Sequence, residues 1–217
     1  MTLYSQPRHH PDPDLLLAYA GGSLAEVKAL FVATHLAYCP ACRARVRAFE
    51  AQCGEWLEAC DPAGADDPAV EDMLAAVLGM IDSGLPGEPP PAGRTPPPAR
   101  LAWMPEPLRS YRGLPDADGW DEVSPGVALS AWSYAAGGTS ARLLRMAPGA
   151  AVPAHHHAAM EGLLVLQGCF TDEYGSFTRG DAVTYGAGSD HHAKGAGVED
   201  CICLLVLDAD LVFLDEG

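Results

Sequence analysis

Apolar positions are spaced differently in the two halves of the chain. Before about residue 83, alanine and leucine dominate, and apolar residues recur every three or four positions, as on one face of a helix. After about residue 100, apolar runs are short and are broken by Gly and Pro, a pattern typical of an all-β domain. The sequence therefore predicts a helical half followed by a β half.

A proline-rich segment separates these halves. Seven of the sixteen residues in 84–99, GLPGEPPPAGRTPPPA, are proline, which excludes a helix or a central strand. Such a segment is expected to behave as an extended, semi-rigid spacer. We therefore predict a helical domain over residues 1–83, a linker over 84–99 and a β domain over 100–217.

Three helices are expected in the first sixty residues. A short one over 12–20 is closed by two glycines. Ser23, with Glu26 three positions later, predicts a capping box that opens a second helix running to about Cys39. Pro40 suits the first turn of a third helix, which should extend to about residue 59.

A fourth helix, expected over 68–81, has one strongly apolar face. A loop over 61–67 separates it from the third helix. The face either closes the helical bundle or docks into a groove of a partner protein, and the periodicity alone does not choose between them. Its residues are Val70, Met73, Leu74, Val77, Leu78 and Ile81.

The β half contains several runs typical of strands. We expect strand-like units over 108–114, 127–136, 141–147, 162–171, 182–186 and 201–210.

Charge and composition narrow the function. A net charge of −16 argues against direct binding of nucleic acid, because phosphate contacts rely on Lys and Arg; it favours a basic protein partner or simply solubility. The sequence has no run of ~20 apolar residues and no signal-peptide pattern. We therefore expect a cytoplasmic protein without a membrane segment, whose seven cysteines serve metal or redox chemistry rather than a disulfide framework.

The first candidate metal site is His35-x3-Cys39-x2-Cys42. His35 and Cys39 lie about one turn apart on one helical face, and Cys42 follows across a helix junction. A fourth ligand, supplied by His9 or His10, would complete a closed tetrahedral site. The competing interpretation is a chance C-x-x-C beside an exposed histidine; a thioredoxin-like pair fits poorly because no βαβ pattern surrounds it.

The segments HPDPDLLLAYAGGSL and HLAYCPAC resemble the zinc-binding anti-sigma domain that binds extracytoplasmic-function sigma factors. The resemblance covers roughly residues 8–83. It implies that zinc is held by His10, His35, Cys39 and Cys42, with His9 as the alternative first ligand. It also implies that the fourth helix packs against the sigma factor.

The second candidate metal site combines His155, His157, Glu161 and His191. Residues two apart on a strand point to the same side, so the first two imidazoles should converge, and the other two ligands should arrive from a turn and a distant strand. Three imidazoles and a carboxylate suit Zn, Fe, Mn or Ni.

Glycine spacing around these ligands resembles both cupin motifs, G-x5-H-x-H-x3-E-x6-G and G-x5-P-x-G-x2-H-x3-N. The first runs from Gly149 to Gly168, and the second begins at Gly180. In the second motif, Gly186 replaces the proline and Gly195 replaces the asparagine, but neither change removes a ligand. The resemblance implies a small all-β barrel or jelly roll over most of residues 101–217.

Cys201 and Cys203 form a C-x-C on a late strand, so their thiols should share one face. One interpretation is a redox-sensing pair near the metal site. The other is two small buried core residues, which is a common role for free cysteine.

The two halves together resemble the ChrR-type anti-sigma factors, which pair a four-helix zinc-binding anti-sigma domain with a C-terminal cupin barrel in an α+β multidomain chain. The resemblance implies zinc in both sites, a sigma factor as partner, and release of that factor under singlet oxygen or organic peroxides. It implies a regulator and not an enzyme. The alternatives are a dioxygenase-like cupin metalloenzyme with a regulatory N-terminal domain and, more weakly, a metal-responsive regulator acting through the cupin alone.

Overall fold

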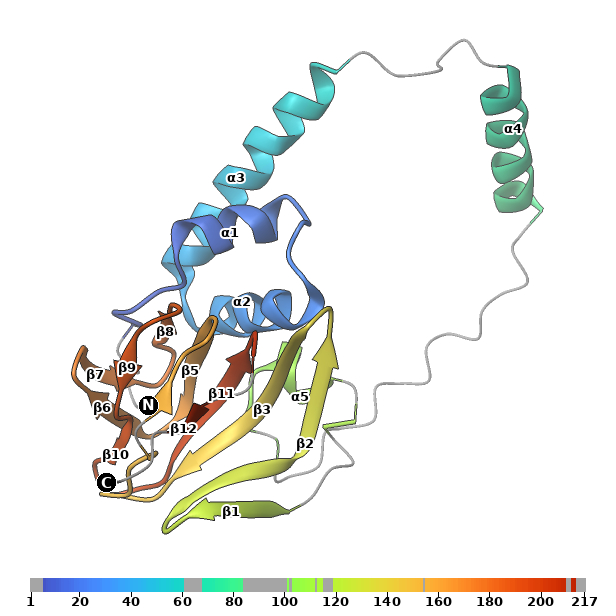
Figure 1. The fold of residues 1–217 in the computed structure, drawn as a ribbon. Coiled ribbons are helices and arrows are strands. Elements are labelled where there is room, and N and C mark those ends of the chain that lie inside the picture. Colours follow the sequence, from blue (N-terminus) through green and yellow to red (C-terminus); the bar gives the residue numbers. More distant parts are fainter. Residues whose placement is uncertain are drawn as a thin grey trace.

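The computed structural model describes residues 6–60, 68–83 and 101–209, apart from 102, 112, 115–118 and 154, and the backbone of 212–213. The expected linker over 84–99 lies outside the described residues. Helices come first along the chain (Figure 1). They are α1 (Pro13–Ala20), α2 (Glu26–Tyr38), α3 (Pro40–Glu58), α4 (Pro68–Asp82) and the short α5 (Glu106–Arg109).

The β half forms a cupin-like sandwich, which together with the helical N-terminal part confirms the predicted fold class. One sheet has the order β1-β2-β3-β11-β5-β8, and two smaller sheets have the orders β10-β6-β7 and β12-β4-β9. The strands are β1 (Trp120–Ser124), β2 (Val127–Ala136), β3 (Thr139–Met146), β4 (His155–His156), β5 (Glu161–Gln167), β6 (Cys169–Asp172), β7 (Gly175–Thr178), β8 (Ala182–Tyr185), β9 (Asp190–His191), β10 (Lys194–Ala196), β11 (Cys201–Leu207) and β12 (Val212–Phe213).

The two most apolar strands, β5 and β11, are buried on both faces. On β5, Leu163 and Val165 point into the barrel, whereas Leu164 and Leu166 join the core on the opposite face. β11 alternates in the same way and pairs with β5 in antiparallel register. Burial on both faces explains why these strands read as continuous apolar runs rather than as an alternating pattern.

Helix α2 packs across one end of the large sheet, where β2, β3, β11 and β5 lie side by side (Figure 1). Val27, Leu30 and Phe31 of this helix belong to the same hydrophobic core as Leu164 and Leu204 of the sheet. The Phe31 ring lies 3.3 Å from the point where a Cβ would stand on Gly162, so the missing side chain admits the ring. The helical and β halves are therefore packed on one shared core.

Two local predictions are wrong. Helix α2 begins at Glu26 with Ala25 as N-cap and no side-chain cap, because Ser23 is used elsewhere. Its N–H and Oγ both donate to the carbonyl oxygen of Ala18, at 2.9 and 3.2 Å, and so close the end of α1. Ser23 therefore belongs to the C-terminal end of α1 and does not form the expected capping box at the start of α2.

The second error concerns 108–114, which is not a strand. Prolines at 105 and 107 favour the first turn of a helix, and α5 forms there. The chain then turns so that Leu108 and Leu114 both enter the core shared with α2. The apolar residues of this run are therefore buried from a helical turn and the chain that follows it, and not from a strand.

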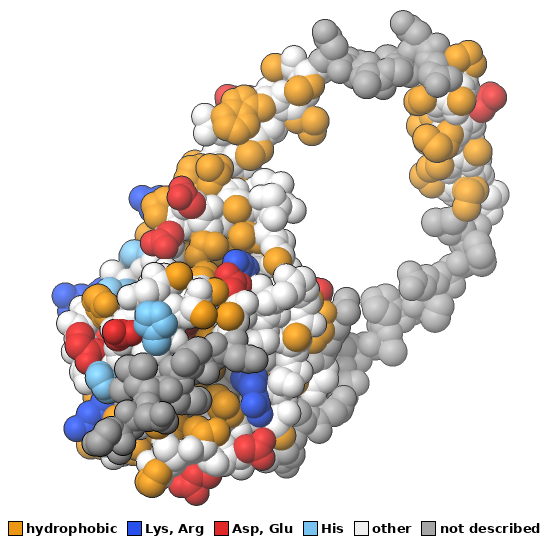
Figure 2. Space-filling view, in the orientation of Figure 1, with side chains coloured by type: hydrophobic (Ala, Val, Ile, Leu, Met, Phe, Trp, Pro, Cys, Tyr) orange, Lys and Arg blue, Asp and Glu red, His pale blue; other side chains and the backbone are white. Residues whose placement is uncertain are grey.

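Helix α4 lies apart from the other described elements (Figure 1). Every residue from 68 to 83 is exposed, including the whole apolar face. Among the described residues the helix therefore does not close a bundle. Hydrophobic side chains line both α4 and the far end of α3, where Trp56 and Leu57 are exposed (Figure 2).

No described helix has the length and apolar content needed to span a membrane.

Candidate metal centres

The N-terminal candidate ligands come together at one point. Donor atoms of His10, His35, Cys39 and Cys42 all lie within 4.8 Å of one another. The Nδ1 atom of His10 is 3.4 Å from the Sγ atom of each cysteine. The structure thus gathers the three residues of the H-x3-C-x2-C motif with one upstream histidine.

The junction of α2 and α3 creates this arrangement. His35 lies in the last turn of α2, and Cys39 is the extended residue between the two helices. Its Sγ accepts a hydrogen bond from the N–H of Cys42 at 3.3 Å, as an N-cap side chain does. Pro40 begins α3, so the spacing of the motif follows from one sharp turn between two helices.

The neighbouring His9 points elsewhere. Its ring packs on Phe177 with a centroid separation of 4.6 Å, and its Nδ1 is 3.6 Å from an oxygen of Asp181. Of the two alternatives left open by the sequence, the structure brings His10 to the cluster.

The protonation of this cluster suits a soft divalent metal. His35 donates from Nδ1 to the carbonyl oxygen of Gly180 at 2.9 Å, and its buried Nε2 has no hydrogen-bond partner among the described residues. Burial is the main cause that lowers the pKa of His35 to about 4; the hydrogen bond to Gly180 opposes this shift and nearby His10 adds to it, so the imidazole is neutral. The pKa of Cys42 is raised to about 12, mainly by burial and also by its interaction with the neighbouring sulfur of Cys39. A zinc ion fits this donor set, since it takes the place of thiol protons in closed sites of two sulfurs and two nitrogens.

The cupin candidate ligands converge inside the barrel. Glu161 lies at the centre: its carboxylate oxygens are 3.4 Å from Nε2 of His155, 3.3 Å from that of His157 and 3.6 Å from that of His191. The Nε2 atoms of His155 and His191 are 3.1 Å apart. All four residues are at most 3% exposed.

Strand register explains how distant residues meet here. Strands β4 and β9 pair so that His155 lies opposite His191. Strands β5 and β8 pair so that Glu161 lies opposite Tyr185. His157 follows β4 directly, and its ring centroid is 4.9 Å from that of His155. The imidazoles therefore converge because the short strands β4 and β9 pair at these residues, and not because the histidines alternate along one long strand.

Each imidazole is held from behind through Nδ1. His155 contacts the carbonyl oxygen of Pro153 at 2.9 Å, His157 contacts the hydroxyl of Ser189 at 3.2 Å, and His191 contacts Asp172 at 3.3 Å. Such contacts fix the tautomer that turns Nε2 toward a metal. None of these three partners is predicted from the sequence, and of them only Asp172 carries a charge that signals such a role.

The charges of this cluster compensate one another. Burial by itself would raise the pKa of Glu161, but hydrogen bonds and charge from His155 and His191 lower it to about 2. Burial would lower the pKa of His191, but Asp172 and Glu161 raise it to about 9. A divalent cation would replace the proton between these groups, because three neutral imidazoles and one carboxylate form a ligand set for zinc or another transition metal.

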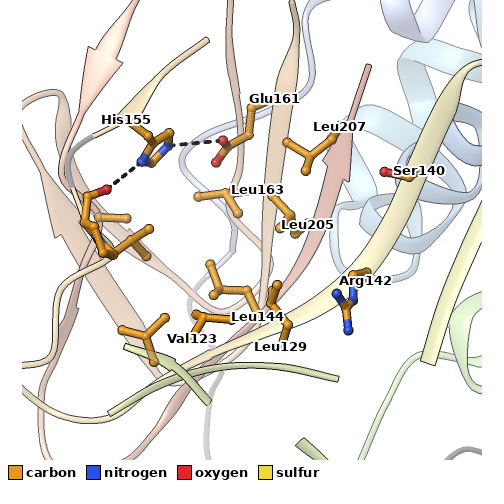
Figure 3. A pocket seen from close by; sticks show the side chains of 14 residues that line it. Val123, Leu129, Ser140, Arg142, Leu144, His155, Glu161, Leu163, Leu205 and Leu207 are labelled. Carbon is orange, nitrogen blue, oxygen red and sulfur yellow. Dashed lines mark hydrogen bonds and ion pairs between the residues drawn. The ribbon is translucent and has the colours of Figure 1, made fainter. Parts of the chain in front are cut away.

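A cavity of about 490 Å³ lies beside this cluster. His155 and Glu161 are at one end, and the apolar side chains of Val123, Leu129 and Leu144 lie at the other (Figure 3). Arg142 also reaches the wall, but its guanidinium donates to the carbonyl oxygen of Ser130 at 2.6 Å. The cavity therefore offers an apolar space with a polar end at the metal cluster.

The other candidate residues divide between interior and surface. Cys201 and Cys203 are buried on the barrel side of β11, with sulfur atoms 3.7 Å apart. Burial raises the pKa of Cys203, so its thiol is protonated and weakly nucleophilic. His156 and His192 are exposed and pair with acidic neighbours, apart from the metal cluster.

Comparison with known proteins agrees with this architecture. Residues 114–209 match the model of the ChrR Cupin-like domain. The chain is 39% identical to the Anti-sigma-E factor ChrR of Cereibacter sphaeroides over 208 residues, covering 95% of this chain and 92% of that protein. A crystal structure of Rhodobacter sphaeroides SigE in complex with the anti-sigma ChrR superposes with a TM-score of 0.73 at 35% identity, covering 92% of this chain and 98% of the matched chain. The chain described here belongs to the ChrR family of anti-sigma factors.

Proposed function

We propose that this chain binds and inhibits an extracytoplasmic-function sigma factor and releases it on an oxidative signal. The similarity to an anti-sigma factor over nearly the whole chain carries the proposal. Residues 1–83 form the inhibitory module, 84–99 the linker and 100–217 the sensing cupin. Because sigma factors act with RNA polymerase, the proposed place of action is the cytoplasm.

Helix α4 supplies the main contact with the sigma factor in this proposal. Its apolar face is exposed along its whole length, and burial of such a face in a groove gives the binding energy of many helix-mediated complexes. The helical half also carries five Lys and Arg against twelve Asp and Glu through residue 83, a balance that suits basic surfaces of a sigma factor.

A charge placed on the apolar face tests this binding. The doubly substituted Leu74→Asp, Leu78→Asp chain should fail to co-purify with the sigma factor and fail to block its transcription in vitro. Val198→Asp, a change of the same kind at a residue 98% exposed on the cupin, is the matched control. Full inhibition by the double variant would overturn the proposed contact.

The two metal centres have separate roles in this proposal. Zinc held by His10, His35, Cys39 and Cys42 stabilises the inhibitory module. Zinc held by the cupin cluster is the proposed sensing centre, where it would act as a Lewis acid beside the apolar cavity. The apolar wall of the cavity suits an organic peroxide. Cys201 and Cys203, both buried on the barrel side of β11, are the proposed redox-sensing thiols.

A His155→Ala variant separates inhibition from release. It should bind and inhibit the sigma factor normally, yet keep it bound after treatment of cells with organic peroxide or singlet oxygen. His156→Ala, an exposed neighbour outside the metal cluster, should respond like the parent chain. Normal release from the His155→Ala variant would exclude the cupin cluster as the sensing centre.

The cavity also favours a second function, that of a cupin metalloenzyme. Its apolar wall and polar end resemble a small-molecule pocket. Oxygen uptake with a diketone or small thiol, lost in His157→Ala, would establish this activity. The absence of uptake by the metal-loaded chain would leave regulation as the role of the cavity.

A further inference from the structure

We propose that a turn of the cupin, Gly180–Ala182, clamps the N-terminal metal centre and sets its affinity for metal. The inference rests on the proposed metal centre at His10, His35, Cys39 and Cys42. The turn lies between β7 and β8, and it contacts both the ligand His35 and the chain segment that carries His10.

The first contact is the carbonyl oxygen of Gly180. It accepts the Nδ1 proton of His35 at 2.9 Å, across 145 residues of sequence. This bond leaves Nε2 of His35 free to face the cluster. The ring that would bind metal is therefore oriented by the cupin and not by its own helix.

The second contact is the carboxylate of Asp181, which is 1% exposed. One oxygen accepts the N–H groups of Arg8 and His9 at 2.6 and 2.9 Å. The other oxygen accepts the N–H and hydroxyl of Thr178, at 2.8 and 3.0 Å. The N–H of Ala182 donates to the carbonyl oxygen of His9 at 3.1 Å. These bonds fix the backbone immediately before His10, which has no helix or strand of its own to hold it.

The close approach of the two halves depends on Gly180 itself. Its φ is +92°, and a Cβ there would lie 2.8 Å from Cγ of Pro7 and 3.0 Å from Cβ of Tyr38. Any other residue would push the turn away from the N-terminal segment. Glycine is thus required for the contact as well as for the backbone conformation.

The same turn is connected to the cupin cluster. It leads directly into β8, whose Tyr185 hydroxyl donates to Asp172. Asp172 in turn contacts Nδ1 of His191. A change at the cupin centre that moves β8 would therefore also move the turn Gly180–Ala182, which supports the N-terminal centre. The sensing half is in this way mechanically coupled to the inhibitory half.

Cobalt and zinc binding to the full chain test the clamp. Thiolate-to-cobalt charge-transfer absorption reports the N-terminal centre alone, because the four cupin ligands include no sulfur. Asp181→Ala should weaken metal binding there by about 10- to 100-fold in chelator competition, the usual effect of losing a residue that orients a ligand. Thr178→Val, which removes only the hydroxyl bond on the cupin side, should bind like the parent chain.

A second pair of variants covers the case in which Asp181→Ala fails to fold. Gly180→Ala should weaken the centre, whereas Gly138→Ala, with a similar φ of +82° and no atom within 4 Å of the added Cβ, should not. Parent affinity in folded Asp181→Ala or Gly180→Ala would overturn the clamp alone. No charge-transfer band in the parent chain would overturn the metal centre and the clamp together.

Discussion

The two metal clusters differ in their donors and in what surrounds them. The N-terminal cluster has two sulfurs and two imidazoles, and its His10 is exposed. The cupin cluster has three imidazoles and one carboxylate, all buried. Thiolate sites of the first kind are closed and structural, whereas a set of nitrogens and one oxygen beside a cavity leaves room for a ligand.

The two clusters also differ in how many buried residues surround them. Helix α1 buries only Leu16, and α3 buries only Cys42 and Val46, whereas α2 buries six residues against the sheet and its neighbouring helices. Strand β5, in contrast, is buried from Glu161 to Leu166. We infer that metal holds α1 and α3 on α2, while the barrel holds its own cluster in place. The predictions below test this difference, beginning with the largest effect.

Cys42→Ala should have the largest effect. Structural zinc contributes an apparent ~10–16 kcal/mol to the folding of small zinc domains, so the helical half should lose both its metal and its helical circular dichroism. Metal analysis should show a loss of about one zinc equivalent per chain. Cys60→Ala, at an exposed cysteine just beyond the C-terminus of α3, is the control. A helical half that stays folded without metal would show that it depends on metal no more than the barrel does.

Phe31→Ala should destabilise the contact between the halves. The ring is 3% exposed and fills the space left by Gly162. Loss of a buried Phe costs about 3–5 kcal/mol, measured as the free energy of unfolding in urea. Leu57→Ala, at a residue 75% exposed on α3, should change it little. An equally small effect at Phe31 would mean that the two halves fold independently.

The sequence predicts the parts of this molecule better than their assembly. Helical periodicity identifies α1 to α4, and short apolar runs broken by Gly and Pro identify the main strands, because both patterns reflect which residues of each element are buried. The packing of Phe31 on Gly162 could not be predicted, because the residues next to each of them in sequence give no sign of a contact between the two segments. The same holds for Ser23, whose role depends on the α1 terminus rather than on the helix that follows.

In the candidate sites, likewise, the ligands could be predicted from the sequence but the residues that support them could not. Spacing predicts that His35, Cys39 and Cys42 lie together and that His155 and His157 converge, because ligands separated by a turn or by two strand positions must share a side. Glu161 and His191 are supported by the resemblance to the cupin motifs, and the choice of His10 over His9 rests on family resemblance alone. Their supporting residues could not be found this way. Gly180 and Asp172 are distant in sequence from the histidines that they hold, and tertiary packing, of α2 on the cupin and of one small sheet against another, brings them close.

Asp172→Asn should weaken the cupin centre without unfolding the barrel. Its carboxylate orients His191 and accepts the Tyr185 hydroxyl. Loss of such support lowers metal affinity of the cupin centre by about 10- to 100-fold, measured by chelator competition. Glu173→Gln, which alters the exposed partner of His192, is the matched control. Parent affinity in Asp172→Asn would show that the barrel positions His191 without this carboxylate.

Lys28→Met should have the smallest effect, although it also joins the two halves. Nζ of Lys28 lies 2.7 Å from Oδ2 of Asp208, whose other oxygen accepts the Thr139 hydroxyl. Both charges remain partly solvated, so the pair should contribute only about 0.2–1 kcal/mol to the free energy of unfolding. A double-mutant cycle with Asp208→Asn isolates this coupling, and about 1 M salt should reduce it by screening. A coupling as large as the loss at Phe31 would mean that charge, rather than the shared apolar core, holds α2 on the sheet.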